Sequence, residues 1–369
     1  MSLALYRKYR PRLLDDLLGQ EANVEILRNA ARENRFAHAY LFYGSRGTGK
    51  TTTARLIAKL LNCEKRAEDA KFRKKGEPCN ACRSCEEIDR NFSLDVIEID
   101  AASNRGIEEI RNLKENLKSA PTGGRFKVYI IDEAHMLTGP AFNALLKTLE
   151  EPPAHVVFVL ATTEYEKLPA TITSRTQRFI FKKLTKSKIL SKLRLIAAEE
   201  KIDIEPSALE LVAAAAEGSL RDAESLLDQL SSVKGKIDLA TAERLTGRVG
   251  FKKVDGLAEL LLKDELEAAL KYLSEVNEEG HNLVQLTRDL IHYLRKILAL
   301  KLAPALEEAF HGELTGEELA RVKSLGALME PERGVALIKA LIRAYAEMRY
   351  SPFAMVPLEM VLVENLKSK

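Results

Sequence analysis

Residues 41–53 read LFYGSRGTGKTTT, an apolar run that ends in a glycine-rich turn followed by Lys-Thr. The segment 44–51 fits the pattern GxxxxGK[ST], after an expected strand at 39–44 and at the start of an expected helix. Glycines let backbone N–H groups wrap around phosphates, and a helix N-terminus adds positive potential. The loop is therefore predicted to bind nucleotide phosphates; a chance glycine turn is the alternative.

The roles of individual loop residues follow from this pattern. Lys50 is expected to reach the β- and γ-phosphates, and the Thr51 hydroxyl to bind Mg²⁺. ATP or ADP with Mg²⁺ is thus the expected cofactor. The candidate nucleotide-binding residues of the loop are Gly44, Ser45, Arg46, Gly47, Thr48, Gly49, Lys50, Thr51 and Thr52.

A phosphate loop of this kind needs an acidic partner, and the stretch VYIIDE at 128–133 supplies one at the end of an apolar run. Asp132 is expected to hold the Mg²⁺ shell. Glu133 is expected to polarise the attacking water as a general base. In the alternative interpretation, these two acids merely begin the next helix. His135 follows without a clear chemical role, and we interpret it as structural.

Hydrophobic patterning divides the chain into three parts. Strands are predicted at 39–44, 94–101, 126–134, 155–163 and 178–183, with helices between them, which indicates a parallel sheet. Helices are predicted at 185–200, 206–217 and 219–231, without a strand between about 184 and 246, and the chain is helical again from about 250. We predict an α/β domain over 1–183 and helical domains over 184–246 and 247–369.

Two threonines end the fourth predicted strand. If this strand lies beside the strand that leads into the phosphate loop, Thr162 or Thr163 would bring a hydroxyl near the γ-phosphate. Threonine is also common in strands for packing reasons alone, which is the alternative.

The four cysteines of the chain are Cys63, Cys79, Cys82 and Cys85, with the spacing C-x15-C-x2-C-x2-C. Four thiolates in so short a span can close a tetrahedral site, for which Zn²⁺ is the natural occupant. Because protein ligands fill every position, such a site would be structural. Free buried thiols and a redox pair are the alternatives. The charged stretch between the first two cysteines is expected to be a solvated loop, with DNA contact as a minority interpretation.

Composition limits the function classes. The 369 residues carry a formal net charge of only +3, so any nucleic-acid contact would need a local basic face or several copies of the chain. No apolar run is long enough to span a bilayer, and the N-terminus lacks the apolar core of a signal peptide. A cytoplasmic location without membrane partners is expected.

The motifs together resemble a known family, the gamma/tau subunits of the bacterial DNA polymerase III clamp loader. The resemblance is carried, in chain order, by YRKYRP, GQE, HAYLFYGSRGTGKTTTARLIAKLLNC, the cysteine module, EIDAASN, FKVYIIDEAHML, FNALLKTLEEPP, LATTE, SRT and GSLRDAESLLDQ. It is dense over residues 1–245 and thinner in the helical remainder. It implies an AAA+ module with an inserted zinc module at about 63–85, a helical lid, and an all-α collar that assembles subunits into a ring-like pentamer.

The resemblance also implies roles for residues that spacing alone does not assign. Arg175, in the SRT motif, matches an arginine finger that reaches the γ-phosphate bound by a neighbouring subunit. Arg221 matches a second sensor, which comes from the lid and touches the phosphates of its own chain. Thr163 matches the first sensor, with Thr162 as the alternative. The YRKYRP segment and Gly19-Gln20 match the stretch that lines the adenine pocket.

The sequence departs from the family pattern in two places. The first cysteine spacing is longer here than in other members, so the shape of the intervening loop stays open. Family members place basic residues after EIDAAS against DNA phosphates; Arg105 and Arg111 are the candidates here, although the register differs and a solvated helix face is the alternative. Contacts of this kind would confer affinity without sequence preference.

The resemblance implies an ATP-hydrolysing motor subunit that opens a sliding clamp and loads it onto primer–template DNA, without polymerase chemistry of its own. Its partners would be the delta and delta-prime subunits, further gamma/tau copies, the sliding clamp and primed DNA. Longer members would carry additional C-terminal domains beyond the point where this chain ends. One alternative is an AAA+ branch-migration translocase, which should lack the four cysteines. Another is a non-hydrolysing structural subunit, which should have a degraded phosphate loop.

Overall fold

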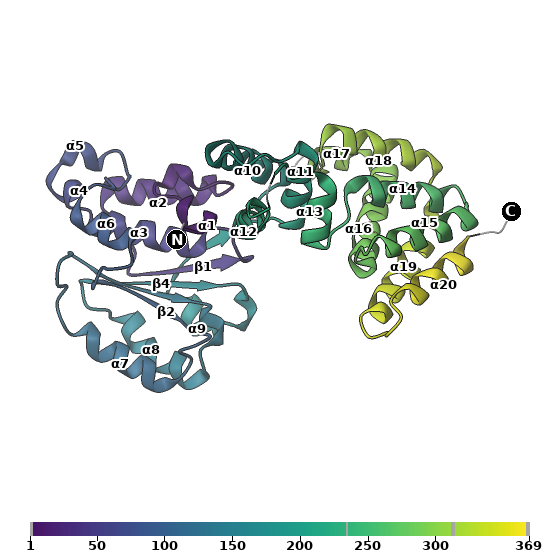
Figure 1. Ribbon diagram of the computed structural model, residues 1–369. Helices are drawn as coiled ribbons and strands as arrows, with labels where there is room; N and C mark the ends of the chain where they lie inside the picture. The colour runs from purple at the N-terminus through teal and green to yellow at the C-terminus, as the bar shows by residue number, and fades with distance from the viewer. Residues whose placement is uncertain (1–2, 234, 311–313, 367–369) are drawn as a thin grey trace. The chain divides into compact units, whose positions relative to one another are not determined.

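The computed structural model describes residues 3–233, 235–310 and 314–366 (Figure 1). The chain divides into two compact units, which are described separately. The first comprises Met1–Leu184 with Ser219–Arg221, and the second comprises Thr185–Gly218 with Asp222–Lys369. Within the described residues, no helix is both long and apolar enough to cross a membrane.

The first unit is organised around a five-stranded sheet. Its strands are β1 (Ala39–Gly44), β2 (Val96–Asp100), β3 (Lys127–Asp132), β4 (Val156–Thr162) and β5 (Gln177–Phe181). They follow the order β2-β3-β4-β1-β5, and every neighbouring pair is parallel. The predicted parallel sheet is thereby confirmed, and each strand end lies within two residues of the expected position.

Helices cover both faces of this sheet (Figure 1). Along β1, Tyr40 and Phe42 join one core cluster, whereas Ala39 and Leu41 join the other, because successive side chains of a strand point to opposite faces. The described helices of the unit are α1 (Leu5–Lys8), η1 (Leu14–Asp16), α2 (Glu21–Glu33), α3 (Lys50–Asn62), α4 (Glu64–Glu68), α5 (Ala70–Arg73), α6 (Arg83–Asp89), α7 (Ile107–Leu117), η2 (Ala134–Met136), α8 (Gly139–Glu150), η3 (Tyr165–Lys167) and α9 (Ala170–Thr173).

The strand order decides where the functional side chains meet. Strand β4 lies between β1 and β3, so the carboxyl ends of these three strands share one edge of the sheet. All seven residues of β4 are buried. Because helices cover both faces of this central strand, its sequence is a nearly continuous apolar run. The sequence-based condition that β4 pairs with β1 is confirmed, with Tyr43 opposite Thr162.

The second unit is helical in its described residues. It begins with α10 (Lys186–Glu200), α11 (Pro206–Ala215), α12 (Leu220–Ser231) and α13 (Leu239–Thr246). The first two residues of α12, Leu220 and Arg221, belong to the first unit. An isolated β-bridge joins Ile204 and Ile237. The remaining helices are α14 (Phe251–Leu262), α15 (Leu266–Glu278), α16 (Leu283–Leu302), η4 (Pro304–Leu306), α17 (Glu307–Phe310), α18 (Gly316–Leu328), α19 (Pro331–Met348) and α20 (Met355–Asn365).

A single apolar cluster joins the helices from α14 onward, and α16 supplies many of its fully buried side chains. Leu286, Leu290 and Leu294 recur on one face of α16 at the spacing of a helix that packs against neighbours along its length. The division of this unit into domains at 184–246 and 247–369 stays a prediction.

Candidate nucleotide and metal sites

Two positions in the loop after β1, Gly44 and Gly47, have backbone conformations and close neighbours that exclude a larger residue. Gly44 has a φ of +135°, and a Cβ there would lie 2.1 Å from the Phe181 carbonyl oxygen. Gly47 has a φ of +70°, and its Cβ would lie 1.9 Å from Ser219 Oγ. The backbone N–H of Leu220 donates to the Gly47 carbonyl at 3.1 Å. Glycine is therefore required both by conformation and by the close approach of the chain at 219–220.

Lys50 opens α3 and turns its side chain back into the loop. Its Nζ donates to the carbonyl oxygens of Gly44 and Ser45, each at 2.8 Å. Burial lowers the pKa of Lys50, while Glu133 and Asp132 oppose this shift. The ammonium thus lies inside the phosphate loop, next to the two acids at the end of β3.

The candidate magnesium ligands are adjacent. Thr51 Oγ1 donates to Asp132 Oδ2 at 2.7 Å, although 81 positions separate the two residues. A hydroxyl and a carboxylate are oxygen ligands of the kind that Mg²⁺ prefers. Within the loop, Thr48 is buried and donates to the Ser45 carbonyl, whereas Arg46 is exposed and Thr52 is half-buried on the first turn of α3.

Glu133 follows β3 with φ +46°, a left-handed conformation that costs a residue with a side chain about 1–3 kcal/mol. Thr163 Oγ1 donates to its Oε2 at 3.0 Å. Thr162 is instead fully buried, and its Oγ1 lies 2.9 Å from His135 Nδ1. Of the two candidate threonines, Thr163 is therefore the one that contacts the candidate base.

Arg175 lies after α9 and is held by its own chain. Its Nε donates to Glu150 Oε1 at 2.8 Å, and its NH2 group also contacts that oxygen. Its NH1 group donates to the Thr171 carbonyl at 2.8 Å and to Ser174 Oγ at 3.2 Å. The side chain is 34% exposed, so it lies at the surface while most of its N–H donors are occupied.

Arg221 lies near the N-terminal segment. Its guanidinium carbon is 5.0 Å from the centroid of the Tyr6 ring. Burial lowers the pKa of Arg10, the neighbouring Arg55 and Arg221 add to this, and Glu98 opposes it. Arg10 and Arg55 thus join Arg221 in a basic group, which no spacing rule could identify because its members lie on three separate segments.

Gln20 closes a contact between the start of α2 and the end of β5. Its amide donates to the Lys182 carbonyl at 2.9 Å and accepts from the Lys182 N–H at 3.3 Å. The preceding Gly19 has a φ of +71°. Both polar atoms of this side chain are therefore used within the fold, and the role of the segment in an adenine pocket stays a prediction.

Arg105 and Arg111 flank the start of α7, and both are exposed. Arg111 forms an ion pair with Glu108 one turn earlier on the same helix. Such a pair is typical of a solvated helix face and contributes little stability. DNA contact at these two residues stays a prediction.

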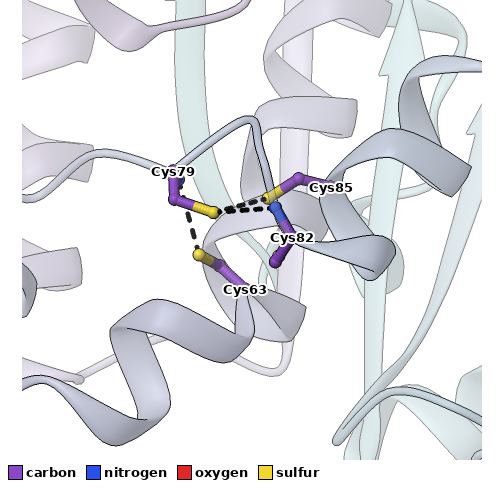
Figure 2. Close-up of side chains that lie close together, drawn as sticks. All are labelled: Cys63, Cys79, Cys82 and Cys85. Carbon is purple, nitrogen blue, oxygen red and sulfur yellow. Dashed lines mark hydrogen bonds between the residues drawn. The ribbon is translucent and has the colours of Figure 1, made fainter.

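The four cysteines come together although one of them lies at the end of α3 and the others precede or open α6 (Figure 2). None forms a disulfide, and the four Sγ atoms all lie within 4.8 Å of one another. Tetrahedral zinc with Zn–S bonds of about 2.3 Å needs sulfurs about 3.8 Å apart. The Cys79 and Cys85 sulfurs are 4.0 Å apart. The donor set and its spacing fit Zn²⁺.

Backbone N–H groups point at these sulfurs. Cys79 N donates to Cys63 Sγ at 3.4 Å, and Cys82 N donates to Cys79 Sγ at 3.2 Å. The Cys85 thiol, hydrogen-bonded to Cys63, lowers the pKa of Cys63 to about 4, and the same bond raises the pKa of Cys85. Donors aimed at sulfur favour the thiolate, which is the form that binds a metal.

A buried arginine lies beside the cysteines. Arg66, in α4, is 1% exposed. Its guanidinium donates to the Ala31 carbonyl in α2 at 2.6 Å and contacts the Leu60 carbonyl in α3, while its Nε has no partner among the described residues. Burial lowers the pKa of Arg66, and the nearby Cys63 and Cys85 sulfurs oppose that shift.

Comparison with known families accounts for most of the chain. Residues 19–185 match the family "DNA polymerase III, delta subunit". Residues 188–232 match "DNA polymerase III clamp loader subunit, ATPase lid domain". Residues 237–368 match "DNA polymerase III subunits gamma and tau domain III".

Solved structures resemble the chain only weakly. A Bacillus subtilis DNA clamp loader delta protein has a TM-score of 0.42 at 14% identity, over 93% of this chain and 99% of that one. The Thermotoga maritima RuvB Holliday junction branch migration motor has a TM-score of 0.46 at 19% identity, over 74% of this chain and 86% of that one.

Similar sequences extend over nearly the whole chain. The DNA polymerase III subunit tau of Bacillus subtilis is 43% identical over 98% of this chain, and that of Escherichia coli is 40% identical over 98%. The chain spans only 62% and 55% of the lengths of these two relatives. The DNA polymerase III subunit gamma of Buchnera aphidicola (Schizaphis graminum) is 35% identical over 98% of this chain and 97% of its own length. The chain therefore belongs to the gamma/tau subunit family of bacterial DNA polymerase III.

Proposed function

We propose that the chain is the ATP-hydrolysing motor subunit of a clamp loader, which opens a sliding clamp and loads it onto primer–template DNA. The observation that supports this most directly is the meeting of two pairs at one edge of the sheet. Thr51 contacts Asp132, and Thr163 contacts Glu133, beside the Lys50 ammonium. An intact site of this kind argues against a non-hydrolysing structural subunit.

The residues divide the chemical work. Lys50 would leave its loop carbonyls to bind the β- and γ-phosphates, and backbone N–H groups of the loop would hold the phosphate oxygens. Thr51 and Asp132 would hold Mg²⁺, which neutralises charge that develops on the phosphates. Glu133 would polarise the attacking water, and Thr163 would fix the orientation of that carboxylate.

Two arginines would link hydrolysis to assembly. Arg175 lies at the surface, as a finger supplied to a neighbouring subunit must, and would stabilise the transition-state charge there. Arg221 would contact the phosphates of its own chain and report the nucleotide state through the chain at 219–221. Release of Arg175 from Glu150 would then accompany closure of the ring.

Family membership supports the proposed partners and the proposed roles of the parts of the chain. The all-α part from about 247 would form the collar that joins this chain to delta, delta-prime and further gamma/tau copies. Arg105 and Arg111 would contact the phosphates of primed DNA. Zn²⁺ on Cys63, Cys79, Cys82 and Cys85 would have a structural role, since four protein ligands leave no open position for chemistry.

Steady-state ATP hydrolysis tests the proposal. The chain would be mixed with partner clamp-loader subunits, and turnover measured without additions, with sliding clamp, with primed DNA, and with both. A large stimulation that needs clamp and primed DNA together is expected. Stimulation by any duplex without clamp would favour a branch-migration motor, and turnover that no mixture changes would contradict the clamp-loading role.

A further inference from the structure

His135 stands between the groups that serve hydrolysis and the segment that leads to Arg175. Its side chain is only 6% exposed. Its Nδ1 lies 2.9 Å from Thr162 Oγ1 and 3.5 Å from Glu133 Oε2. Its Nε2 lies 3.1 Å from Glu164 Oε1. The ring thus contacts the ends of both β3 and β4.

These partners select one arrangement of protons. Lys167, and to a smaller degree His135, hold the pKa of the Glu164 carboxyl below its usual range, so this group is an acceptor. His135 Nε2 therefore carries the proton and donates a hydrogen bond to Glu164. Nδ1 is then free to accept from the Thr162 hydroxyl, whose oxygen accepts the Glu164 backbone N–H at 3.1 Å. The Thr162 hydroxyl thus donates to the ring and accepts from the backbone.

The network constrains the candidate base. Thr163 follows Thr162 directly in the chain and donates to Glu133 at 3.0 Å. A ring whose Nδ1 edge faces both Thr162 and Glu133, and whose Nε2 edge is held by Glu164, leaves this pair little freedom. Glu133 also has a left-handed backbone, which surrounding contacts must maintain.

We propose that His135 is a positioning residue for ATP hydrolysis, which holds the Thr163–Glu133 pair through Thr162 and ties that pair to the segment 164–175 through Glu164. Beyond Glu164, this segment runs through η3 and α9 to Arg175. The same ring therefore connects the hydrolytic site of one chain with the arginine that serves its neighbour. The inference rests on the proposed ATPase function.

The competing role for His135 is a purely structural one, as a satisfied histidine that supports two strand ends. The two roles predict different kinetics. A structural defect would lower thermal stability and nucleotide affinity together with turnover. A positioning defect would lower kcat at unchanged KM for ATP, because nucleotide binding by the phosphate loop does not need the Thr163–Glu133 pair to be aligned.

Three substitutions distinguish the contribution of the Nδ1 edge of the ring from that of the Nε2 edge. His135→Asn places an amide near the position of Nδ1, and His135→Gln reaches toward the position of Nε2, while His135→Ala removes both. Each full-length variant would be assembled with partner subunits, clamp and primed DNA. His155→Ala is the matched control, because His155 directly precedes β4, at the end remote from Thr162, and its ring contacts the Leu117 carbonyl.

The expected result is a split between the kinetic constants. His135→Ala should lower kcat by roughly 10- to 100-fold without changing KM, a size typical of misplaced catalytic groups. His135→Asn should recover most of the lost kcat, and His135→Gln should not, because only the asparagine amide can occupy the position next to Thr162 and Glu133. His155→Ala should match the wild type.

The Asn and Gln comparison holds even if His135→Ala fails to fold. Three outcomes would each overturn the inference. They are an unchanged kcat in the variants, equal recovery of kcat by Asn and Gln, and a fall in Tm and kcat together with a rise in KM. If the wild type hydrolyses ATP in no mixture, the proposed function fails and the inference with it. An active wild type beside unaffected variants removes the inference alone.

Discussion

The candidate nucleotide site draws its side chains from positions as far apart as Lys50 and Arg221, whereas the four cysteines of the candidate metal site all lie between residues 63 and 85. In the first site, bonds such as Thr51–Asp132 cross from one strand end to another, so the sheet must form before the site exists. In the second, the N–H groups of Ala81 and Cys82 point at the Cys79 sulfur, and the Cys79 N–H points at the Cys63 sulfur, 16 positions earlier. The comparison teaches that the nucleotide site depends on topology, and the cysteine site on a short local loop.

Lys50→Ala is the strongest test of this difference. Removing the ammonium should abolish detectable ATP binding, because Lys50 is buried inside the loop, whereas the other cation of the loop, Arg46, is exposed. Titration with a fluorescent ATP analogue measures this, and metal analysis of the same sample should give an unchanged zinc content. Binding that survives the change would remove the phosphate-loop assignment.

Arg175→Ala should act only between subunits. Turnover in the assembled complex should fall by roughly 10³–10⁵, the range known for arginine fingers, while the isolated chain binds ATP normally. Arg178→Ala is the matched control, since Arg178 is exposed on β5 and donates to the Tyr165 hydroxyl. An equal loss of turnover in a true monomer would show that Arg175 acts within its own chain.

Glu133→Gln should separate binding from chemistry. The amide keeps the shape of the side chain but cannot serve as a base, so turnover should fall by roughly 10²–10⁴ at unchanged ATP affinity. Single-turnover hydrolysis beside an equilibrium titration measures both quantities. Glu166→Gln, at an exposed position nearby in η3, provides the control. Normal turnover in Glu133→Gln would exclude this residue as the base.

Cys82→Ser tests the four-cysteine site. Loss of one thiolate should empty the metal site and lower the melting temperature, by about 2–4 °C for each 1 kcal/mol of lost stability in a domain of this size. Nucleotide affinity should remain measurable. Ser84→Ala is the control, because Ser84 lies in α6, directly after Cys82 and Arg83, and the change removes a hydroxyl and no sulfur. The zinc assignment fails if elemental analysis of wild-type protein prepared without chelators finds no metal.

Features that depend on residues close together in the sequence could be predicted from the sequence. The five strands could be placed within two residues because buried parallel strands read as short apolar runs between helices. The phosphate loop could be assigned because its glycines and Lys50 follow one another directly. The proximity of the four sulfurs followed from their spacing. The membership of the family, expected from the order of the motifs, is confirmed by the comparisons.

Contacts between distant segments could not be foreseen in the same way. Nothing in the spacing of the sequence indicates that Glu150 binds Arg175, or that Ser219 approaches Gly47 so closely. His135 could be noticed but given no role, since its partners at 162 and 164 lie on another strand end. Such pairs depend on the register and order of strands, which hydrophobic periodicity does not specify.

The buried Arg66 connects the candidate metal site with two helices outside its own loop. Four thiolates with one Zn²⁺ carry a formal charge of −2, and the interior guanidinium beside them offsets part of it. If the four thiolates take up protons when the metal is lost, the guanidinium that joins the Ala31 and Leu60 carbonyls would remain as a positive charge without compensation between α2 and α3. Metal occupancy and the anchoring of the phosphate-loop helix would thus be thermodynamically linked, so that each strengthens the other.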